Sequence, residues 1–183
     1  MFYSKKLKKF KEIHHCFFSR KKGFSKGVYK GLNCGKGSND NKKNIIRNLN
    51  FVSKKMKVNS DKLILMYQTH SNKVTEVKKN NYIKKINSDA LITKVNGFAL
   101  GVVTADCVPV LIYDRVNKIV GCIHAGWKGA FSGIIKNTIL RIKKKHSKNH
   151  IFASVGPCIG NKSYEVDFKF FNKFINKSKK NKI

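Results

Sequence analysis

The chain has 183 residues, with 40 lysines and arginines against 9 aspartates and glutamates, for a net charge of +31. Its length suits one domain, and its 41% of apolar residues is enough for a packed core, which excludes a wholly disordered polycation. No apolar run approaches the ~18 residues of a membrane span, and residues 1–10 alternate lysine with apolar residues instead of forming a secretory signal. We therefore expect a cytoplasmic protein with one domain over residues 1–183 and no contact with a membrane.

Apolar periodicity, interrupted by glycine-rich breaks, predicts the secondary structure in chain order. Short apolar or alternating runs predict strands at 16–19, 62–67, 73–77, 88–93, 98–104, 108–113, 118–123 and 151–155. Three- and four-residue spacing predicts helices at 40–57, 127–146 and 166–175.

The segment 114–117 favours a hairpin, and in the second helix we expect Phe131, Ile135 and Ile142 to be buried. No internal repeat or interior linker divides these elements. The prediction is therefore an α+β fold, a mixed β-sheet sandwich flanked by helices.

The high positive charge does not by itself indicate a nucleic-acid-binding protein. Bases and phosphates are read best by arginine, yet the basic residues include few arginines: Arg20, Arg47, Arg115 and Arg141. The lysines are scattered along the chain, and asparagine and isoleucine are abundant too, which is typical of A/T-rich codons. We interpret the lysines as a solvated surface, with loose electrostatic binding to RNA at low salt but no specific nucleic-acid site.

The cysteines do not form a disulfide framework, because they are odd in number and widely spread: Cys16, Cys34, Cys107, Cys122 and Cys158. We expect them to be reduced thiols. The simplest expectation for each is a small buried side chain.

Metal-binding side chains lie at the ends of three predicted strands: His70, Cys107 and His124. Two imidazoles and a thiolate are a common donor set for zinc, and three protein ligands leave the fourth position open for water or substrate. The three residues do not form a short local motif such as C-x-x-C. Spacing alone therefore leaves a second interpretation open, in which the histidines are hydrogen-bonded and the cysteine is part of the core.

Longer motifs around these residues add a resemblance to a known family. They are DALIT at 89–93, GVVTADCVPV at 101–110, GCIHAGWKG at 121–129, GPCIG at 156–160 and YEV at 164–166, preceded by HCFFSR at 15–20. In this order they resemble the bacterial YfiH-type laccase-domain family, and the resemblance covers nearly the whole chain.

That family is regarded as purine nucleoside phosphorylases with additional adenosine deaminase activity, and was formerly labelled polyphenol oxidase. The resemblance implies phosphorolysis of adenosine, inosine and related nucleosides, with purine nucleosides and phosphate as substrates. Carried over residue by residue, the family's zinc ligands and catalytic residues fall on His70, Cys107 and His124. The expected cofactor is zinc rather than copper.

Three further side chains are candidates for substrate binding. Arg20 lies in a family-like motif of a chain that otherwise uses lysine, so we expect a fork-like contact to phosphate or ribose. Gln68 shares a strand face with His70 and is either a nucleoside contact or a solvent-facing residue. Asp106, beside Cys107, either orients a ligand, accepts a substrate proton or caps a turn.

Relatives in this family continue through a further segment rich in aromatic and arginine residues. We therefore expect either a fragment or a shortened member of the family, with an uncovered sheet edge or core face near the site and weak or no phosphorylase activity. The alternative is that the helix at 166–175 closes the gap with Phe168, Phe171 and Phe174 on one face.

Other functions stay open at this point. A cysteine hydrolase would use Cys107 as nucleophile and His124 as base, and would not need His70. A non-catalytic basic RNA-associated protein would bind without a defined site and lose binding at moderate salt. A copper oxidase has the least support, because the sequence lacks visible candidates for the several copper sites of a laccase.

Overall fold

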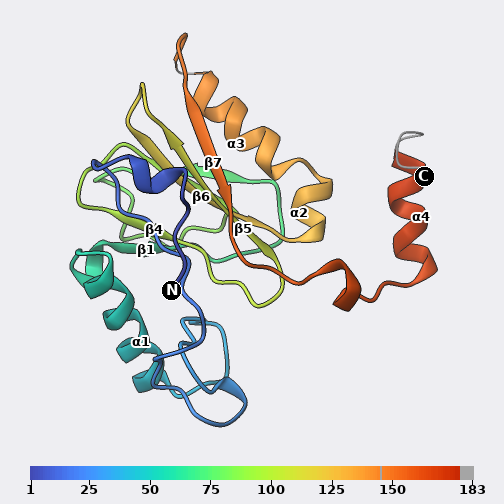
Figure 1. The fold of residues 1–183 in the computed structure, drawn as a ribbon, viewed down its shortest axis with the longest axis horizontal. Coiled ribbons are helices and arrows are strands. Elements are labelled where there is room, and N and C mark those ends of the chain that lie inside the picture. The colour runs from blue at the N-terminus through green and yellow to red at the C-terminus, as the bar shows by residue number, and fades with distance from the viewer. Residues whose placement is uncertain (145, 178–183) are drawn as a thin grey trace.

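The computed structural model describes residues 1–144 and 146–177 (Figure 1). The strands in this part of the chain are β1 Leu63–Leu65, β2 Val74–Glu76, β3 Ala90–Thr93, β4 Ala99–Gly101, β5 Val108–Asp114, β6 Ile119–Ala125 and β7 Ile151–Val155. The α-helices are α1 Lys42–Lys55, α2 Trp127–Phe131, α3 Ile134–Lys143 and α4 Phe168–Lys177.

The larger sheet has the strand order β2-β3-β6-β5-β7, and the smaller one pairs β1 with β4. The pairs β2–β3 and β1–β4 are parallel, whereas β3–β6, β5–β6 and β5–β7 are antiparallel. The predicted hairpin is present, since β5 and β6 pair along their whole length. The α+β prediction with mixed sheets and flanking helices is confirmed.

The larger sheet is the central layer, because its side chains alternate between two apolar clusters. Ile92 and Ile123 pack with Ile134 and Ile142 of α3 on one face. Their sequence neighbours Leu91 and Cys122 pack on the other face with residues around β1, including Ile64 and Met66. Burial on both faces explains why β3 and β6 read as nearly continuous apolar runs.

The predicted helix at 127–146 is wrong as a single element. Gly133 takes a left-handed backbone conformation, with φ of 87°, and separates α2 from α3. The buried residues of α3 are Ile134, Thr138 and Ile142. Ile135, expected in the core, is 39% exposed. Ile142 is buried as expected and Phe131 is half-buried; residue 145, near the expected helix end, lies outside the described residues.

The helix α4 is present close to where it was predicted, and its contact face differs from the expected one. In Figure 1 it stands beside α2 at the end of a long connection. Phe170 packs against Trp127 and Phe174 against Phe131, with ring centroids 5.0 and 4.9 Å apart. Of the predicted face, Phe168 and Phe171 are 75% and 51% exposed. Phe170 and the predicted Phe174 are four residues apart and so share one face of the helix, and this face meets α2.

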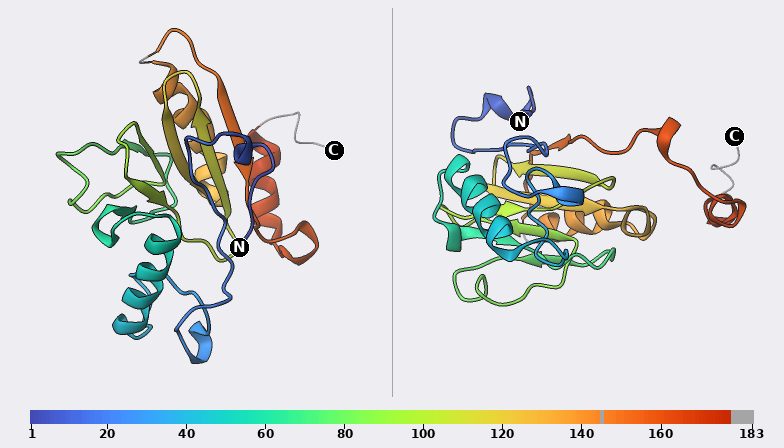
Figure 2. Two further views of the ribbon diagram at one scale, coloured as in Figure 1. Left: turned by 60° about the vertical axis from the view of Figure 1, so that its left-hand side comes forward. Right: turned by 90° about the horizontal axis from the view of Figure 1, so that it is seen from below.

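The N-terminal segment forms no strand at 16–19, contrary to prediction; Phe17 makes a single bridge to Phe2. This irregular segment lies across the body of the molecule, as both views of Figure 2 make clear. Its loops are held by Asn48 of α1, which is fully buried. The Asn48 Nδ2 donates to Ser25 Oγ and to the Asn33 carbonyl at 2.9 and 2.7 Å, and Oδ1 accepts from the Phe24 backbone N at 2.8 Å.

Asn48→Ala is expected to lower the free energy of unfolding by about 1–3 kcal/mol, because it removes the buried amide that bonds Ser25, Asn33 and the Phe24 N–H. Hydrogen exchange should accelerate first in residues 20–35, and urea unfolding gives the size of the effect. Asn50→Ala, on the exposed side of the same helix, is the control and should change little. Equal stability of the two variants would contradict this role of Asn48.

A buried carboxylate, Asp114, closes the far end of the β5–β6 hairpin. It accepts hydrogen bonds from the Val116 backbone at 3.1 Å, from Asn117 Nδ2 at 2.7 Å and from the His150 backbone at 3.2 Å. Burial favours a raised pKa, but these hydrogen bonds outweigh it and lower the pKa of Asp114. The ionised form is therefore the one that stabilises the fold.

Asp114→Asn is expected to destabilise the protein by about 1–3 kcal/mol at neutral pH. A lowered native pKa contributes stability above the unfolded value of about 3.9, and this contribution is lost as the pH falls through the native pKa. The stability gap between wild type and variant should therefore narrow below about pH 4. Urea unfolding between pH 3 and 7 measures it, with the exposed Asp61→Asn as control; a gap that stays constant would refute the linkage.

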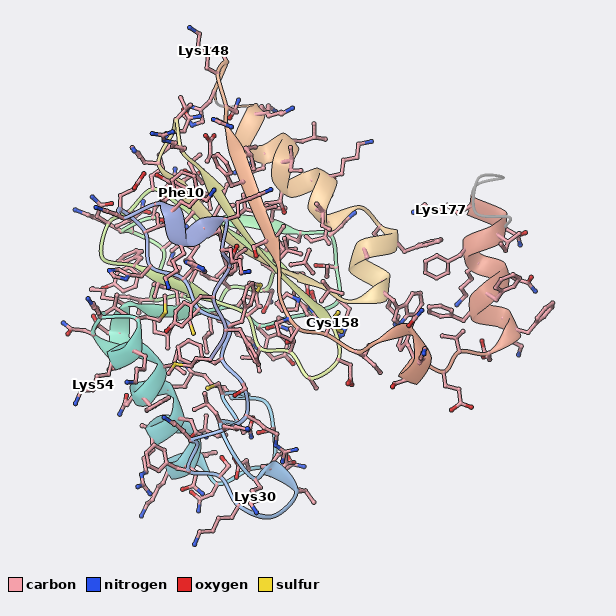
Figure 3. All side chains as sticks on the ribbon, in the orientation of Figure 1. Phe10, Lys30, Lys54, Lys148, Cys158 and Lys177 are labelled. Carbon is pink, nitrogen blue, oxygen red and sulfur yellow. The ribbon has the colours of Figure 1, made fainter. Side chains whose placement is uncertain are left out.

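The lysines are distributed over the surface. Lys30, Lys54, Lys148 and Lys177 lie at separate extremities of the molecule (Figure 3). None of the helices in residues 1–144 and 146–177 combines the length and the apolar character needed to span a bilayer.

Candidate metal centre

Strand register brings the three candidate ligands to one end of the larger sheet. Cys107 directly precedes β5 and His124 lies near the end of β6. These strands are antiparallel, with Pro109 opposite His124, so the start of β5 lies beside the end of β6. His70 lies in the loop between β1 and β2. That loop reaches the same place because β2 pairs with β3, the other neighbour of β6.

The donor atoms of His70, Cys107 and His124 all lie within 4.8 Å of one another. The Cys107 Sγ is 4.0 Å from the His70 Nε2, and the two imidazole rings meet edge to face with centroids 4.8 Å apart. His70 is exposed, Cys107 half-buried and His124 only 2% exposed. The group is thus anchored in the core on one side and open to solvent on the other.

This arrangement fits a tetrahedral metal ion. Zinc bonds of the usual lengths place His and Cys donors about 3.4–3.6 Å apart, so small side-chain rotations close the observed gaps. Gly126 allows two of the ligands to pack closely beside it: a Cβ there would lie 2.8 Å from His70 Cδ2 and 3.0 Å from Cys107 Sγ. The three ligands would leave one position for a substrate atom.

Neighbouring groups keep the free Cys107 thiol protonated. Burial, then the negative charges of Asp106 and Asp89, raise its pKa. A bare thiol in this setting is a poor nucleophile, because the thiolate is the reactive form. A bound cation reverses this balance and favours the thiolate.

The three substrate-binding candidates each make different contacts in the fold. Arg20 is exposed, and its Nε and Nη2 donate to the Lys30 carbonyl at 3.2 and 2.7 Å. Gln68 pairs with the Val103 backbone through both amide atoms, donating at 2.8 Å and accepting at 2.9 Å, so it fastens two strand ends together. Asp106 is exposed beside Cys107, and its backbone carbonyl accepts from the Ile159 N–H at 3.0 Å.

A broad cleft runs between the N-terminal segment and the sheet. Its lining includes Arg20 and Phe17 from the N-terminal segment and Leu111 from β5. Thr104 and Ala105, which lead into Asp106 and Cys107, line it as well. The cleft therefore connects the surroundings of Arg20 with the segment that carries one candidate ligand.

One residue of the site, Asp89, was given no role in the sequence analysis. It is fully buried, and its Oδ1 lies 2.8 Å from the His124 Nδ1. Burial favours a raised pKa, but hydrogen bonds from His124, Ser71 and Thr69 outweigh it and hold the pKa of Asp89 at about 2. A sequence signal existed: an acidic residue stands directly before a buried strand in a chain with 9 acidic residues.

A mixed β-sheet that gathers two histidines and a cysteine at one end defines a candidate metalloprotein. The chain belongs to the family described as multi-copper polyphenol oxidoreductase laccase, whose model matches residues 14–183.

Named relatives extend the comparison. A purine nucleoside phosphorylase of Bacteroides thetaiotaomicron is 32% identical over 92% of this chain and 66% of its own length. One of Rickettsia conorii is 38% identical over 66% of this chain and 49% of its own length. The crystal structure of the hypothetical protein YfiH of Bacillus licheniformis superposes with a TM-score of 0.81 at 29% identity, covering 86% of this chain and 62% of that one. The chain thus spans about half to two thirds of the length of these relatives.

Proposed function

We propose that this chain carries the metal site of a zinc-dependent purine nucleoside phosphorylase with adenosine deaminase activity. The observation that carries the proposal is the convergence of His70, Cys107 and His124, whose donor atoms lie within 4.8 Å of one another. The relatives named purine nucleoside phosphorylase support the reaction class. Adenosine deaminase activity rests on the family resemblance.

Zinc is the proposed metal, because two imidazoles and one thiolate around an open position are typical of catalytic zinc. When bound, zinc would supply Lewis acidity toward an oxygen atom of substrate or water. Copper is the alternative that the same donors admit and that the family's description favours. Metal analysis of the purified protein separates the two.

In the proposed phosphorolysis an oxygen of inorganic phosphate forms a bond to C1′ of the ribose, the bond from C1′ to the purine nitrogen breaks, and the purine leaves with the bonding electron pair and takes up a proton. We assign substrate to the cleft that Arg20, Thr104 and Ala105 line, where Arg20 offers an exposed guanidinium for phosphate or ribose. Solvent water can supply that proton, while Asp106, exposed next to Cys107, is the candidate to accept a substrate proton. Gln68 would act on this site indirectly, because the Val103 backbone occupies its amide.

The cysteine hydrolase is the weaker proposal. It needs a Cys107 thiolate without metal, whereas burial and nearby carboxylates raise the pKa of this thiol. It also leaves His70 without a task. We further propose that residues 1–183 form a single domain and that the protein works in the cytoplasm, since a thiolate ligand requires a reduced cysteine.

The deciding experiment measures release of hypoxanthine and ribose 1-phosphate from inosine, with and without phosphate, together with metal content. We expect weak but phosphate-dependent cleavage by protein containing one zinc per chain. His70→Ala, at an exposed loop position, should abolish it while the circular dichroism spectrum stays unchanged. Phosphate-independent hydrolysis, or activity unaltered by His70→Ala, would contradict the proposal, and stoichiometric copper would correct the metal.

A further inference from the structure

Asp89 joins two of the candidate ligands through a single carboxylate oxygen. Its Oδ1 accepts from the His124 Nδ1 at 2.8 Å and from the His70 backbone N at 3.0 Å. These two residues come from different elements, a strand and a loop. The same oxygen thus holds the ring of His124 and the backbone of His70.

The other oxygen, Oδ2, holds the loop on either side of His70. It accepts from the Ser71 backbone N and Oγ, both at 2.7 Å, and from the Thr69 backbone N and Oγ1 at 3.2 and 3.1 Å. This clamp matters because His70 has a left-handed backbone, with φ of 56°, which costs a residue with a side chain about 1–2 kcal/mol. Bonds on both flanks hold His70 in that conformation and so direct its ring toward Cys107.

The same carboxylate selects which nitrogen His124 presents. A carboxylate at Nδ1 keeps a proton on that nitrogen and leaves the Nε2 lone pair free for a metal. His124 is 2% exposed and cannot turn away easily. Asp89 thereby controls the tautomer of one histidine and the backbone of the other.

From this geometry we infer that Asp89 is a positioning residue, which holds His70 and His124 in metal-binding geometry before the metal arrives. The inference rests on the metal site in the proposed function. Asp89 is 0% exposed and its oxygens are taken up by the loop and by His124, so it does not touch substrate. Its effect should therefore appear in metal affinity and ligand geometry as well as in turnover.

The test compares zinc affinity, measured by chelator competition, and the visible absorption spectrum of the Co²⁺-loaded protein in wild type and Asp89→Asn. The variant keeps the size of the side chain but turns an NH₂ group toward donors of Thr69 and Ser71, or toward His124. We expect zinc affinity to fall about 10–100-fold and the Co²⁺ bands to shift or weaken. Asp114→Asn is the matched control, because it makes the same change at an equally buried carboxylate at the far end of the hairpin.

If Asp89→Asn fails to fold, Ser71→Ala is the second variant that tests the positioning role of Asp89. It removes one bond to Oδ2 and leaves the contact with His124 in place, so a smaller, several-fold loss of affinity is expected. Ser132→Ala, which removes a comparable hydroxyl bond at the end of α2, is its control.

The inference is overturned if Asp89→Asn keeps wild-type zinc affinity and an unchanged Co²⁺ spectrum. The same result in Ser71→Ala overturns it if Asp89→Asn does not fold. The proposed metal site would stand in both cases. An equal loss in the matched Asp114 or Ser132 variant would also overturn the inference, as a general effect of destabilisation. A wild-type protein that binds neither zinc nor cobalt would instead refute the metal site in the proposed function, and the inference with it.

Discussion

Replacing Cys107 with serine is expected to remove most of the bound metal and to lower zinc affinity by at least about 100-fold, more than the loss of a residue that merely supports a ligand. A serine hydroxyl keeps its proton at neutral pH and does not replace a soft thiolate. Metal content after dialysis, together with chelator competition, measures the loss.

Cys158→Ser is the control for this variant, because Cys158 is exposed and also lies in a loop near the end of a strand. It should keep wild-type zinc content. If Cys107→Ser retains one zinc per chain, the proposed ligand set is wrong.

Gly126→Ala should damage the same site without unfolding the protein. The glycine has an ordinary backbone conformation, with φ of −66°, so alanine causes no backbone strain. Its Cβ would instead lie 2.8 Å from His70 Cδ2 and 3.0 Å from Cys107 Sγ, closer than such atoms approach. The exposed His70 ring has to move aside, and it leaves the metal-binding position when it does.

We expect Gly126→Ala to weaken zinc binding about 10–100-fold, similar to the loss of a group that orients a ligand, with an unfolding midpoint near that of wild type. Gly160→Ala is the matched control, because a Cβ there meets nothing within 4 Å and φ is −82°. Zinc titration and thermal unfolding of both variants decide the matter. Unchanged zinc affinity in Gly126→Ala would count against this packing around the site.

Local patterns of the sequence determined much of the secondary structure. The apolar runs of β3, β5 and β6 and the spacing in α1 predicted elements that the structure contains, because burial of those residues demands these periods. The chemistry of the donors was equally visible, since imidazole and thiolate side chains stood at strand ends. The family followed from motifs that include two of these donors, Cys107 and His124.

Local patterns failed where packing between distant segments decides the outcome. The apolar spacing at 127–146 continues through Gly133, yet α3 turns its Ile134 and Ile142 toward the sheet only after a left-handed break. In α4, spacing indicated Phe168, Phe171 and Phe174, whereas the position of α2 selected Phe170 together with Phe174. A helix face is buried only where a partner surface exists, and the partner comes from elsewhere in the chain.

The site itself depends on the tertiary structure in the same way. The sequence by itself determined which side chains can bind a metal. Only the register of β3, β5 and β6 placed Cys107 beside His124 and set Asp89 against both histidines. No local sequence pattern predicts hydrogen bonds between residues so far apart in the chain. The bonds of Asp89 form only after the sheet has assembled and excluded water from its carboxylate.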